Sequence, residues 1–372
     1  MAIRRTSNET GQALKIRAAV LRRRGGPLKI ETLEMESPRD DEILVRVVAS
    51  GICHTDIRYV EDWYGESEGP LVLGHEGGGV VERVGPKVKS VRRGDHVVMS
   101  YQSCGHCPQC RRGHPFDCRH MSELNWGFQR LDGSNALQRS GVKGHFFGQS
   151  SFAAYALATE RNVVKISKSL PLEMLAPLGC GLQTGAGTVM NSLAVPPGAG
   201  IAVFGTGAVG LAAVMAARIV GANPIIGIDI IPRRLKLARE LGATHAIDGR
   251  REDVASRIKT IAGGGVDYTV ETTDNDEMYR LSLDLLNPKG TAALVTGASG
   301  PARLPGGRKS ISIVEGDAVP QEFIPKLIAL WRKGLFPFDR LVKFYDFKDI
   351  NRAIAEAKRG SAIKPVLRIS EA

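Results

Sequence analysis

Six cysteines carry the most informative chemistry in this sequence, and four of them are crowded into one loop. They follow the pattern Cys104-x2-Cys107-x2-Cys110-x7-Cys118 in a segment that contains glycine and proline. Four thiolates at about 2.3 Å from one ion form a tetrahedral zinc cage, and such spacing lets one short segment wrap the metal. The pattern therefore predicts a structural zinc site.

Two other interpretations compete with structural zinc at this loop. An iron–sulfur cluster also binds runs of thiolates and stays open as an alternative. Disulfides are disfavoured, because we expect no secretory leader and therefore a compartment that keeps thiols reduced. The nearby His106, His114 and His120 are interpreted as surface residues, since four sulfurs already fill the coordination shell.

The two remaining cysteines, Cys53 and Cys180, are far apart in the sequence. Taken singly, such a residue is more often a buried apolar filler than a metal ligand. Cys53, however, lies in the segment 51–56, Cys180 lies between two glycines, and His75 and Glu76 begin a third glycine-rich segment. Two thiolates and an imidazole leave one zinc position open for a substrate oxygen. Cys53, His75 and Cys180 are therefore candidate ligands of a catalytic zinc.

A glycine-rich run, Gly205-Thr206-Gly207-Ala208-Val209-Gly210, fits the G-x-G-x-x-G pattern of dinucleotide sites. By itself the pattern is weak, and an ordinary glycine-rich turn is the alternative. Here it follows an apolar strand at 201–204 and opens a helix at 209–220, and Asp229 ends the next strand. These contexts predict a fingerprint whose glycines let the backbone approach a pyrophosphate at the helix N-terminus.

The acidic residue Asp229 determines which cofactor we expect. A carboxylate there accepts hydrogen bonds from the adenosine ribose and repels a 2′-phosphate, so NAD is favoured over NADP. Arg233 and Arg234 follow closely and soften that preference. The candidate cofactor-binding residues also include Arg234, Thr296, Gly297 and Ala298.

These residues lie on two kinds of predicted scaffold. Before residue 180, short β-branched runs at 43–49, 79–84 and 96–100 alternate with glycine and proline turns, which predicts an antiparallel, barrel-like domain. After residue 180, apolar runs alternate with helical segments, which predicts a parallel sheet with helices on both faces. The expected strands are 201–204, 225–228, 245–247, 268–271 and 291–295, and the expected helices are 233–241, 279–286, 323–333 and 347–359.

A last strand at 365–369 is expected to return to the first domain. The predicted domains are therefore 1–181, completed by 323–372, and an inserted nucleotide-binding domain at 182–322.

Composition and charge exclude several functional classes. The chain has 372 residues and a net charge of +11, but its basic residues are scattered and no aromatic platform accompanies them, so nucleic-acid binding is not expected. The uncharged stretch 198–217 holds five glycines and is interpreted as a strand, turn and helix rather than a membrane span. The polar segment 1–12 lacks the hydrophobic region of a signal peptide, so a cytoplasmic location is expected.

The motifs and their order resemble the zinc-containing alcohol dehydrogenases of the medium-chain dehydrogenase/reductase superfamily, from about residue 16 to residue 369. The resemblance implies an α/β protein with a GroES-like antiparallel β-barrel catalytic domain and a doubly wound Rossmann domain. Within the family the chain is most similar to bacterial aryl-alcohol (benzyl-alcohol) dehydrogenases, through segments 144–153, 179–187, 314–317 and 337–341. Related enzymes of this group oxidise allylic terpene alcohols such as geraniol.

The resemblance also implies a role for each candidate residue. Cys53, His75 and Cys180 bind catalytic zinc, with Glu76 behind the metal as an occasional or outer ligand. Asp56 orients His75, since zinc-bound histidines usually need such a partner. The implied substrate and cofactor contacts are those of Thr55 with the substrate hydroxyl, of Thr184 and Val209 with the nicotinamide, and of Lys364 with the pyrophosphate.

One position departs from the family pattern. Many members carry a histidine five residues beyond the first zinc cysteine, at the end of a proton relay, and this chain has Arg58 there. His54 resembles a residue that contacts the pyrophosphate, and we expect it to take over the proton role. Trp63, Trp126, Phe147 and Leu124 are candidate walls of the substrate pocket, although each is as often ordinary core.

The expected reaction is oxidation of a primary aryl or allylic alcohol to its aldehyde, with hydride transfer to NAD and with one catalytic and one structural zinc per chain. The alternatives are a dehydrogenase of thiol adducts (hydroxymethyl conjugates) from the same superfamily, and a zinc-containing binding protein with an inactive site. The partners expected are a small alcohol or aldehyde and a second copy of the chain, in a homodimer or homotetramer.

Overall fold

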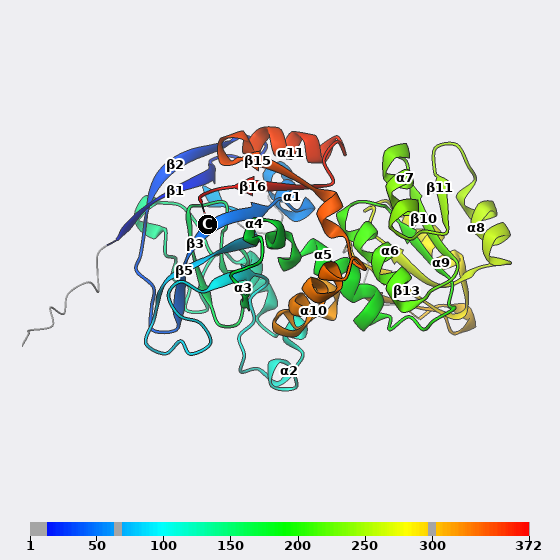
Figure 1. The fold of residues 1–372 in the computed structure, drawn as a ribbon, viewed down its shortest axis with the longest axis horizontal. Helices are drawn as coiled ribbons and strands as arrows, with labels where there is room; N and C mark the ends of the chain where they lie inside the picture. The colour runs from blue at the N-terminus through cyan, green and yellow to red at the C-terminus, as the bar shows by residue number, and fades with distance from the viewer. Residues whose placement is uncertain (1–12, 63–68, 297–302, 372) are drawn as a thin grey trace, which may run out of the picture.

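In the computed structural model, which describes residues 13–62, 69–296 and 303–371, the chain forms two lobes (Figure 1). The left lobe in this view combines the blue and cyan N-terminal segments with the red C-terminal strands. The right lobe consists of the green and yellow middle of the chain, and α5 and α10 lie between the lobes.

Ten strands and most of the short helices build the first lobe. The strands are β1 Leu14–Leu21, β2 Leu28–Met35, β3 Glu42–Gly51, β4 Leu71–Val72, β5 Glu76–Val84, β6 His96–Met99, β7 Tyr155–Thr159, β8 Val163–Ile166, β15 Val342–Asp346 and β16 Lys364–Arg368. The helices are α1 His54–Asp62, α2 Pro108–Arg111, α3 Met121–Trp126, α4 Leu172–Leu175 and α11 Ile350–Lys358, while α10 Pro320–Arg332 lies between this lobe and the second.

Two mainly antiparallel sheets organise these strands. One has the order β2-β1-β4, and the other has the order β15-β16-β3-β5-β6-β8 with β7 also paired to β3. β3 is buried along nearly its whole length, because its valines, isoleucine and leucine pack on both faces. β16 pairs antiparallel with β3, with Val366 opposite Gly51. The predicted return of the last strand to the first domain is therefore confirmed.

The second lobe alternates strands and helices. Its elements are α5 Gly181–Gly187, β9 Ile201–Phe204, α6 Ala208–Val220, β10 Ile225–Asp229, α7 Pro232–Leu241, β11 His245–Asp248, α8 Val254–Ala262, β12 Val266–Glu271, α9 Asp276–Asp284, β13 Leu286–Leu294 and β14 Lys309–Ser312.

The six strands of the second lobe form one parallel sheet with the order β11-β10-β9-β12-β13-β14. Numbered within the lobe, that order is 3-2-1-4-5-6, the arrangement of dinucleotide-binding folds. Ligands of such sheets bind at the carboxyl ends of the strands, where the order reverses. Here that point lies between β9 and β12, so the fold places the glycine-rich run where a nucleotide would bind.

The bounds of helix α9 differ from the prediction, and strand β14 was not predicted. The helix expected at 279–286 begins three residues earlier, because the Asn275 side chain accepts hydrogen bonds from Glu277 N and Met278 N and caps it. Leu286 belongs to β13 instead of the helix. The sixth strand, β14, has the sequence KSIS and was missed, because a single apolar residue carries no periodic signal.

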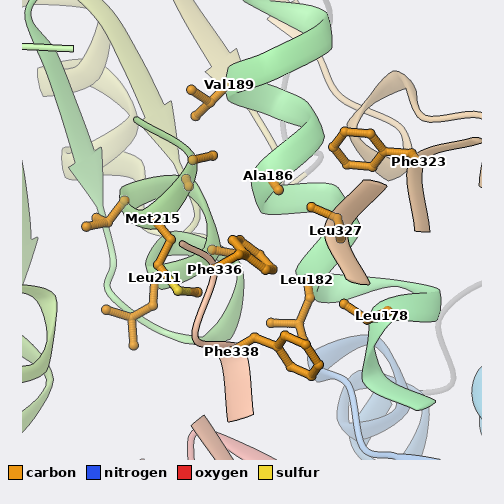
Figure 2. Close-up of a cluster of buried hydrophobic side chains, with 14 of the residues drawn as sticks. Leu178, Leu182, Ala186, Val189, Leu211, Met215, Phe323, Leu327, Phe336 and Phe338 are labelled. Carbon is orange, nitrogen blue, oxygen red and sulfur yellow. The ribbon is translucent and has the colours of Figure 1, made fainter. Parts of the chain in front are cut away.

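The largest hydrophobic core lies at the junction of the lobes (Figure 2). Figure 2 shows Leu182 of α5 near Phe336 and Phe338, with Leu211 and Met215 of α6 beyond them. All five of these side chains are fully buried. Burial of one large apolar side chain stabilises a fold by about 2 kcal/mol, so this shared core fixes the two lobes relative to each other.

No helix in the described part of the chain is long and apolar enough to cross a membrane.

Candidate active site

Four side chains from three separate segments meet in the first lobe, beside its junction with the second. Cys53 directly precedes α1, His75 and Glu76 lie at the start of β5, and Cys180 directly precedes α5. One ligand atom from each of the four lies within 4.8 Å of the others. The structure thus brings together every residue proposed from the sequence for the catalytic zinc.

The buried carboxylate of Asp56 connects two of these ligand-bearing segments. Its Oδ2 accepts a hydrogen bond from Cys53 N at 2.9 Å, and its Oδ1 accepts one from Gly74 N at 3.0 Å. The same Oδ1 lies 3.1 Å from His75 Nδ1. Because an ionised carboxylate only accepts, the proton of the neutral imidazole belongs on Nδ1, and in that form Nε2 has a free lone pair for a metal ion.

His75 Nε2 is buried and, among the described residues, has no hydrogen-bond partner. Leaving a polar atom buried in this way costs about 1–3 kcal/mol, so its lone pair calls for a ligand. The sulfurs of Cys53 and Cys180 belong to the same group of atoms. One imidazole and two thiolates are donors that zinc prefers, so this set fits a zinc ion with a position left for a further ligand.

The titratable groups of this cluster change one another's pKa values. The pKa of Cys53 is held well below its usual value, because Cys180 donates a hydrogen bond to its sulfur and His75 lies beside it. The same hydrogen bond, together with burial, raises the pKa of Cys180 well above its usual value. Burial opposes the charged form of His75, but Asp56 and Cys53 raise its pKa. The cluster therefore attracts positive charge.

Glu76 and Lys364 form a buried ion pair next to the thiols. Lys364 Nζ donates to Glu76 Oε1 at 2.7 Å and to Oε2 at 3.0 Å, and Gly181 N donates to Oε1 at 3.2 Å. Burial raises the pKa of Glu76, and Lys364 counteracts part of this rise. The Lys364 ammonium is thus engaged with Glu76 at the candidate metal site, and its contact with a pyrophosphate stays a prediction.

Glu315 belongs to this site and was missed by the sequence reasoning. Its Oε1 lies 3.3 Å from Cys180 Sγ, and its Oε2 accepts a hydrogen bond from Gln183 Nε2 at 2.9 Å. Burial raises the pKa of this carboxyl to about 7. Its φ of +53° lies in the left-handed region that such residues seldom adopt. The one available signal was its place in the segment 314–317.

Aromatic side chains cover one side of the cluster. The Phe147 ring stacks on the His75 ring at 4.3 Å between centroids, and Trp126 meets Phe147 edge-on at 5.5 Å. Of the four predicted pocket walls, these two therefore lie near the candidate metal site. Leu124 instead packs with Cys107 and Cys118, and Trp63 lies outside the described residues.

The four crowded cysteines form a separate cluster in a loop that leaves the first lobe. All four sulfurs lie within 4.8 Å of one another, and all are free thiols. A tetrahedron with 2.3 Å bonds has edges of about 3.8 Å, so this spacing fits a single ion. Backbone amides of Arg119 and Cys110 lower the pKa of Cys107 to about 6, which favours the thiolate that a metal needs.

The glycines of the predicted fingerprint have distinct roles in the turn from β9 to α6. Gly205 has a φ of +87°, which favours glycine. A Cβ at Gly210 would lie 1.8 Å from Gly205 O, so only glycine fits this close approach. A Cβ at Gly207 would meet nothing within 4 Å, so the N-terminus of α6 faces open space. An anion can therefore approach the free amides there.

Asp229 stands at the end of β10, as predicted, and its carboxylate is held by the backbone. Its Oδ2 accepts hydrogen bonds from Thr206 N at 2.7 Å and Thr206 Oγ1 at 2.9 Å. Its Oδ1 accepts from Ile230 N and Ile231 N, and Arg234 Nη1 lies 3.8 Å from Oδ2. Asp229 thus also fixes the glycine loop, and its contact with a ribose stays a prediction.

The glycine loop and the metal cluster are adjacent. A Cβ at Gly181 would lie 3.5 Å from Glu76 Oε1 and 3.6 Å from Val209 Cγ2. Thr184, on α5, lies 3.5 Å from Glu315 Oε2 through its hydroxyl. Val209 and Thr184, both predicted to flank the nicotinamide, therefore lie near Glu76 and Glu315 of the candidate metal site.

The other predicted cofactor residues are less closely tied to this site. Thr296 donates a hydrogen bond to Glu271 Oε2 at 2.7 Å, at the carboxyl end of β12. Gly297 and Ala298 lie outside the described residues.

The predicted proton path begins on α1. Thr55 Oγ1 lies 3.8 Å from Cys53 Sγ, and His54 is exposed. Arg58, the position that departs from the expected family pattern, forms an ion pair with Asp274 Oδ2 at 2.9 Å. Its guanidinium thus connects α1 of the first lobe to the loop after β12 in the second.

Each lobe of the chain contains a segment that matches a known protein family. Residues 39–168 match the family described as Alcohol dehydrogenase GroES-like domain, and residues 208–326 match the family described as Zinc-binding dehydrogenase.

Individual relatives cover nearly the whole chain. The geraniol dehydrogenase of Castellaniella defragrans is 45% identical over 97% of this chain and 99% of its own. An alcohol dehydrogenase zinc-binding domain protein from Burkholderia ambifaria is 50% identical, with a TM-score of 0.91 over 97% of this chain and 100% of its own. The benzyl alcohol dehydrogenase of Acinetobacter calcoaceticus is 42% identical, with a TM-score of 0.92 over 96% and 100% of the two chains.

Proposed function

Because this chain belongs to the family of zinc-binding alcohol dehydrogenases, we propose that it oxidises a primary aryl or allylic alcohol to the aldehyde and transfers the hydride to NAD. The observation that carries this proposal is the buried Nε2 of His75, which has no hydrogen-bond partner among the described residues and lies with the thiols of Cys53 and Cys180. Gly181 lies between Glu76 of this cluster and Val209 of the glycine-rich turn. An open metal position next to a nicotinamide site is what alcohol oxidation requires.

The substrate class rests on two further observations. Relatives at 42–45% identity are named for benzyl alcohol and for geraniol, one an aryl and the other an allylic alcohol. In this chain the Phe147 ring stacks on His75, and Trp126 packs edge-on against Phe147. Aromatic walls favour a flat unsaturated substituent, since stacked rings add about 0.5–1.5 kcal/mol beyond their burial.

The proposed mechanism assigns a task to each residue. Cys53, His75 and Cys180 would hold a zinc ion, which lowers the pKa of a bound hydroxyl when present. Asp56 keeps His75 in the tautomer that offers Nε2. Glu76 and Lys364 balance the charge beneath the thiolates.

Proton and hydride would leave the substrate by different routes. Thr55 Oγ1 accepts a hydrogen bond from the substrate hydroxyl and passes its proton toward His54, which is exposed to solvent. Thr184 and Val209 would flank a bound nicotinamide, which would accept the hydride. Asp229 supports the glycine loop and makes the site unfavourable for a 2′-phosphate, so NAD is the proposed cofactor.

The proposal includes two zinc ions per chain, the second in the cage of Cys104, Cys107, Cys110 and Cys118. It also includes the domains 1–181, completed by 323–372, and 182–322. We further propose that the protein is a homodimer or homotetramer.

The first experiment follows NADH absorbance with purified protein, NAD, and either benzyl alcohol or geraniol. We expect turnover with both and a kcat/KM for NAD at least tenfold above that for NADP. A matched pair of variants tests the proton route: Thr55→Val removes the hydroxyl at nearly constant volume, and Thr55→Ser keeps it. The valine variant should lose about 100-fold or more in kcat, and the serine variant should retain most of it.

The outcomes separate the competing functions. Turnover that requires an added low-molecular-weight thiol and formaldehyde would replace the proposal with a thiol-adduct dehydrogenase. No turnover with any of these substrates, in protein shown to hold zinc, would indicate a binding protein with an inactive site.

A further inference from the structure

Two histidines of the cysteine loop take no part in the chemistry proposed above. His106 lies between Cys104 and Cys107, and His120 lies two residues after Cys118 at the start of α3. Their ring centroids are 6.0 Å apart. A ring nitrogen of each and the sulfur of Cys104 all lie within 4.8 Å of one another. The fold therefore brings three metal-binding side chains together just outside the four-cysteine cage.

Both imidazoles are oriented in the way that metal-bound histidines are. His106 Nδ1 lies 2.9 Å from Cys104 O, and His120 Nδ1 is bound to Glu123 Oε2. A carbonyl oxygen and a carboxylate oxygen can only accept, so each Nδ1 carries the proton of the neutral ring. Each Nε2 then presents a lone pair. Metal-ligating histidines almost always donate their other N–H to such a carbonyl or carboxylate.

The site is accessible from solvent. His106 and His120 line a hollow of about 310 Å³ together with Glu123, Gln129 and Leu131. The His120 side chain is 37% exposed, and Glu123 supplies a negative charge beside it. An ion with its remaining water ligands fits this volume.

We propose that His106 and His120 form a third metal site, which binds a divalent transition ion through two imidazoles and shares the sulfur of Cys104 with the cage. The expected ions are Zn²⁺ and, in vitro, Ni²⁺ or Cu²⁺, because imidazole nitrogen and thiolate sulfur suit these ions better than Mg²⁺ or Ca²⁺. A thiolate bound to one zinc keeps lone pairs and can bridge to a second. The third site therefore serves as the place where an ion enters or leaves the cage.

The test measures metal content and needs no enzyme activity. Full-length protein without an affinity tag is equilibrated with micromolar free Zn²⁺, and bound zinc per chain is counted by elemental analysis and native mass spectrometry. The double variant His106→Gln/His120→Gln should bind one zinc fewer than the parent. The control variant His114→Gln changes an exposed histidine of the same loop that stacks on Phe116, and it should bind as many as the parent.

Two further measurements test the details. Glu123→Gln leaves both imidazoles in place but weakens the orientation of His120, so the affinity of the third site should fall about tenfold or more. If Cys104 is shared, a chelator should remove zinc from the cage at a different rate in the double variant than in the parent.

Equal zinc content in parent and double variant, or loss of the third ion in His114→Gln, would overturn the proposal. Equal rates of zinc removal would overturn the shared sulfur.

Discussion

The carboxylate of Asp56 accepts hydrogen bonds from Cys53 N, Gly74 N and His75 Nδ1, although it does not belong to the metal-binding group. In Asp56→Asn one of the two acceptor oxygens is replaced by an NH2 group, which can only donate and therefore opposes at least one of these N–H groups. We expect the affinity for the catalytic zinc to fall about 10- to 100-fold. Competition with a chromophoric chelator measures this.

The control for this residue is Asp62→Asn on the same helix, where the carboxylate is exposed and pairs with Arg24. That variant should hold zinc as the parent does. An Asp56→Asn protein with parental zinc affinity would show that the carboxylate does not orient the ligand.

His145 makes stability depend on pH. Burial lowers the pKa of its imidazole to about 3, and its Nε2 accepts a hydrogen bond from Ala136 N at 3.2 Å. In the unfolded chain a histidine titrates near 6.5, so between about pH 6.5 and 3 the unfolded state binds the extra proton. The contribution of this residue is complete above pH 6.5 and falls by roughly 3 kcal/mol by pH 4.

The variant His145→Gln keeps an acceptor and removes the titration. Urea unfolding at pH 7 and pH 4 should therefore show a smaller loss of stability in the variant than in the parent, while His114→Gln should behave as the parent does. The same acid-induced loss in His145→Gln would contradict this assignment.

For single residues, sequence reasoning identifies those whose type and spacing indicate a metal site. It misses residues whose role appears only when the fold brings them next to that site. The types and spacings of Cys53, His75 and Cys180 indicated a metal site because few other uses explain them. Glu315 carried no such mark, since one glutamate resembles another until the fold buries it beside Cys180.

Among the elements, we expect the cysteine loop to depend most on a bound metal ion. The helices around it are short, with four residues in α2 and six in α3, and a helix of that length is not stable alone. Cys107→Ser should therefore lower the melting temperature by roughly 5 °C or more, because bound metal contributes directly to folding. Thermal unfolding followed by circular dichroism measures this.

Cys180→Ser is the matched comparison for this element. It should abolish turnover and leave the melting temperature nearly unchanged, because α5 and the strands around it hold Cys180 in a packed core. If the two serine variants lost equal stability, the division between a structural and a catalytic metal would be wrong.

Elements with long apolar runs were predicted closely, and irregular ones were not. β9 was expected at 201–204 and is observed there, because four buried apolar residues between turns leave little choice. β14 escaped notice because its pairing with β13 uses backbone groups and its side chains are mostly polar. The position of β14 at the edge of the sheet depends on its pairing with β13, and the residues of β14 alone do not predict that pairing.

On the scale of the whole molecule, one core serves both lobes, and Leu182 lies within it (Figure 2). Leu182→Ala should cost about 2–5 kcal/mol of unfolding free energy. Because the cavity lies between the lobes, we expect one cooperative transition at lower denaturant concentration. Leu335→Ala, at a leucine that is 49% exposed, is the control and should change little. A biphasic transition in the parent would show that the lobes unfold separately.

The two-lobed α/β architecture was predictable, and the relation between its lobes was not. Alternating strands and helices predicted the parallel sheet, and its observed order puts Gly207 and Val209 at the switch point. The side-by-side placement of Val209 and Glu76, from opposite lobes, depends on close contacts of glycines such as Gly185, where a Cβ would lie 2.0 Å from Val209 O. Sequence patterns identify such glycines but do not say what they approach.

The pairing of β16 with β3 also has a consequence for how the molecule is made. On the ribosome, residues 42–51 emerge early and wait for their partner strand until residue 364 has been added. The nucleotide-binding sheet, whose strands span 201–312, is contiguous and can form in that interval. The lobe that is started first is thus completed last.

Lys364, on this final strand, also supplies the positive charge that pairs with Glu76, so the charge at the candidate metal site is balanced only when that strand has been added. Insertion of the catalytic metal is accordingly expected at the end of synthesis.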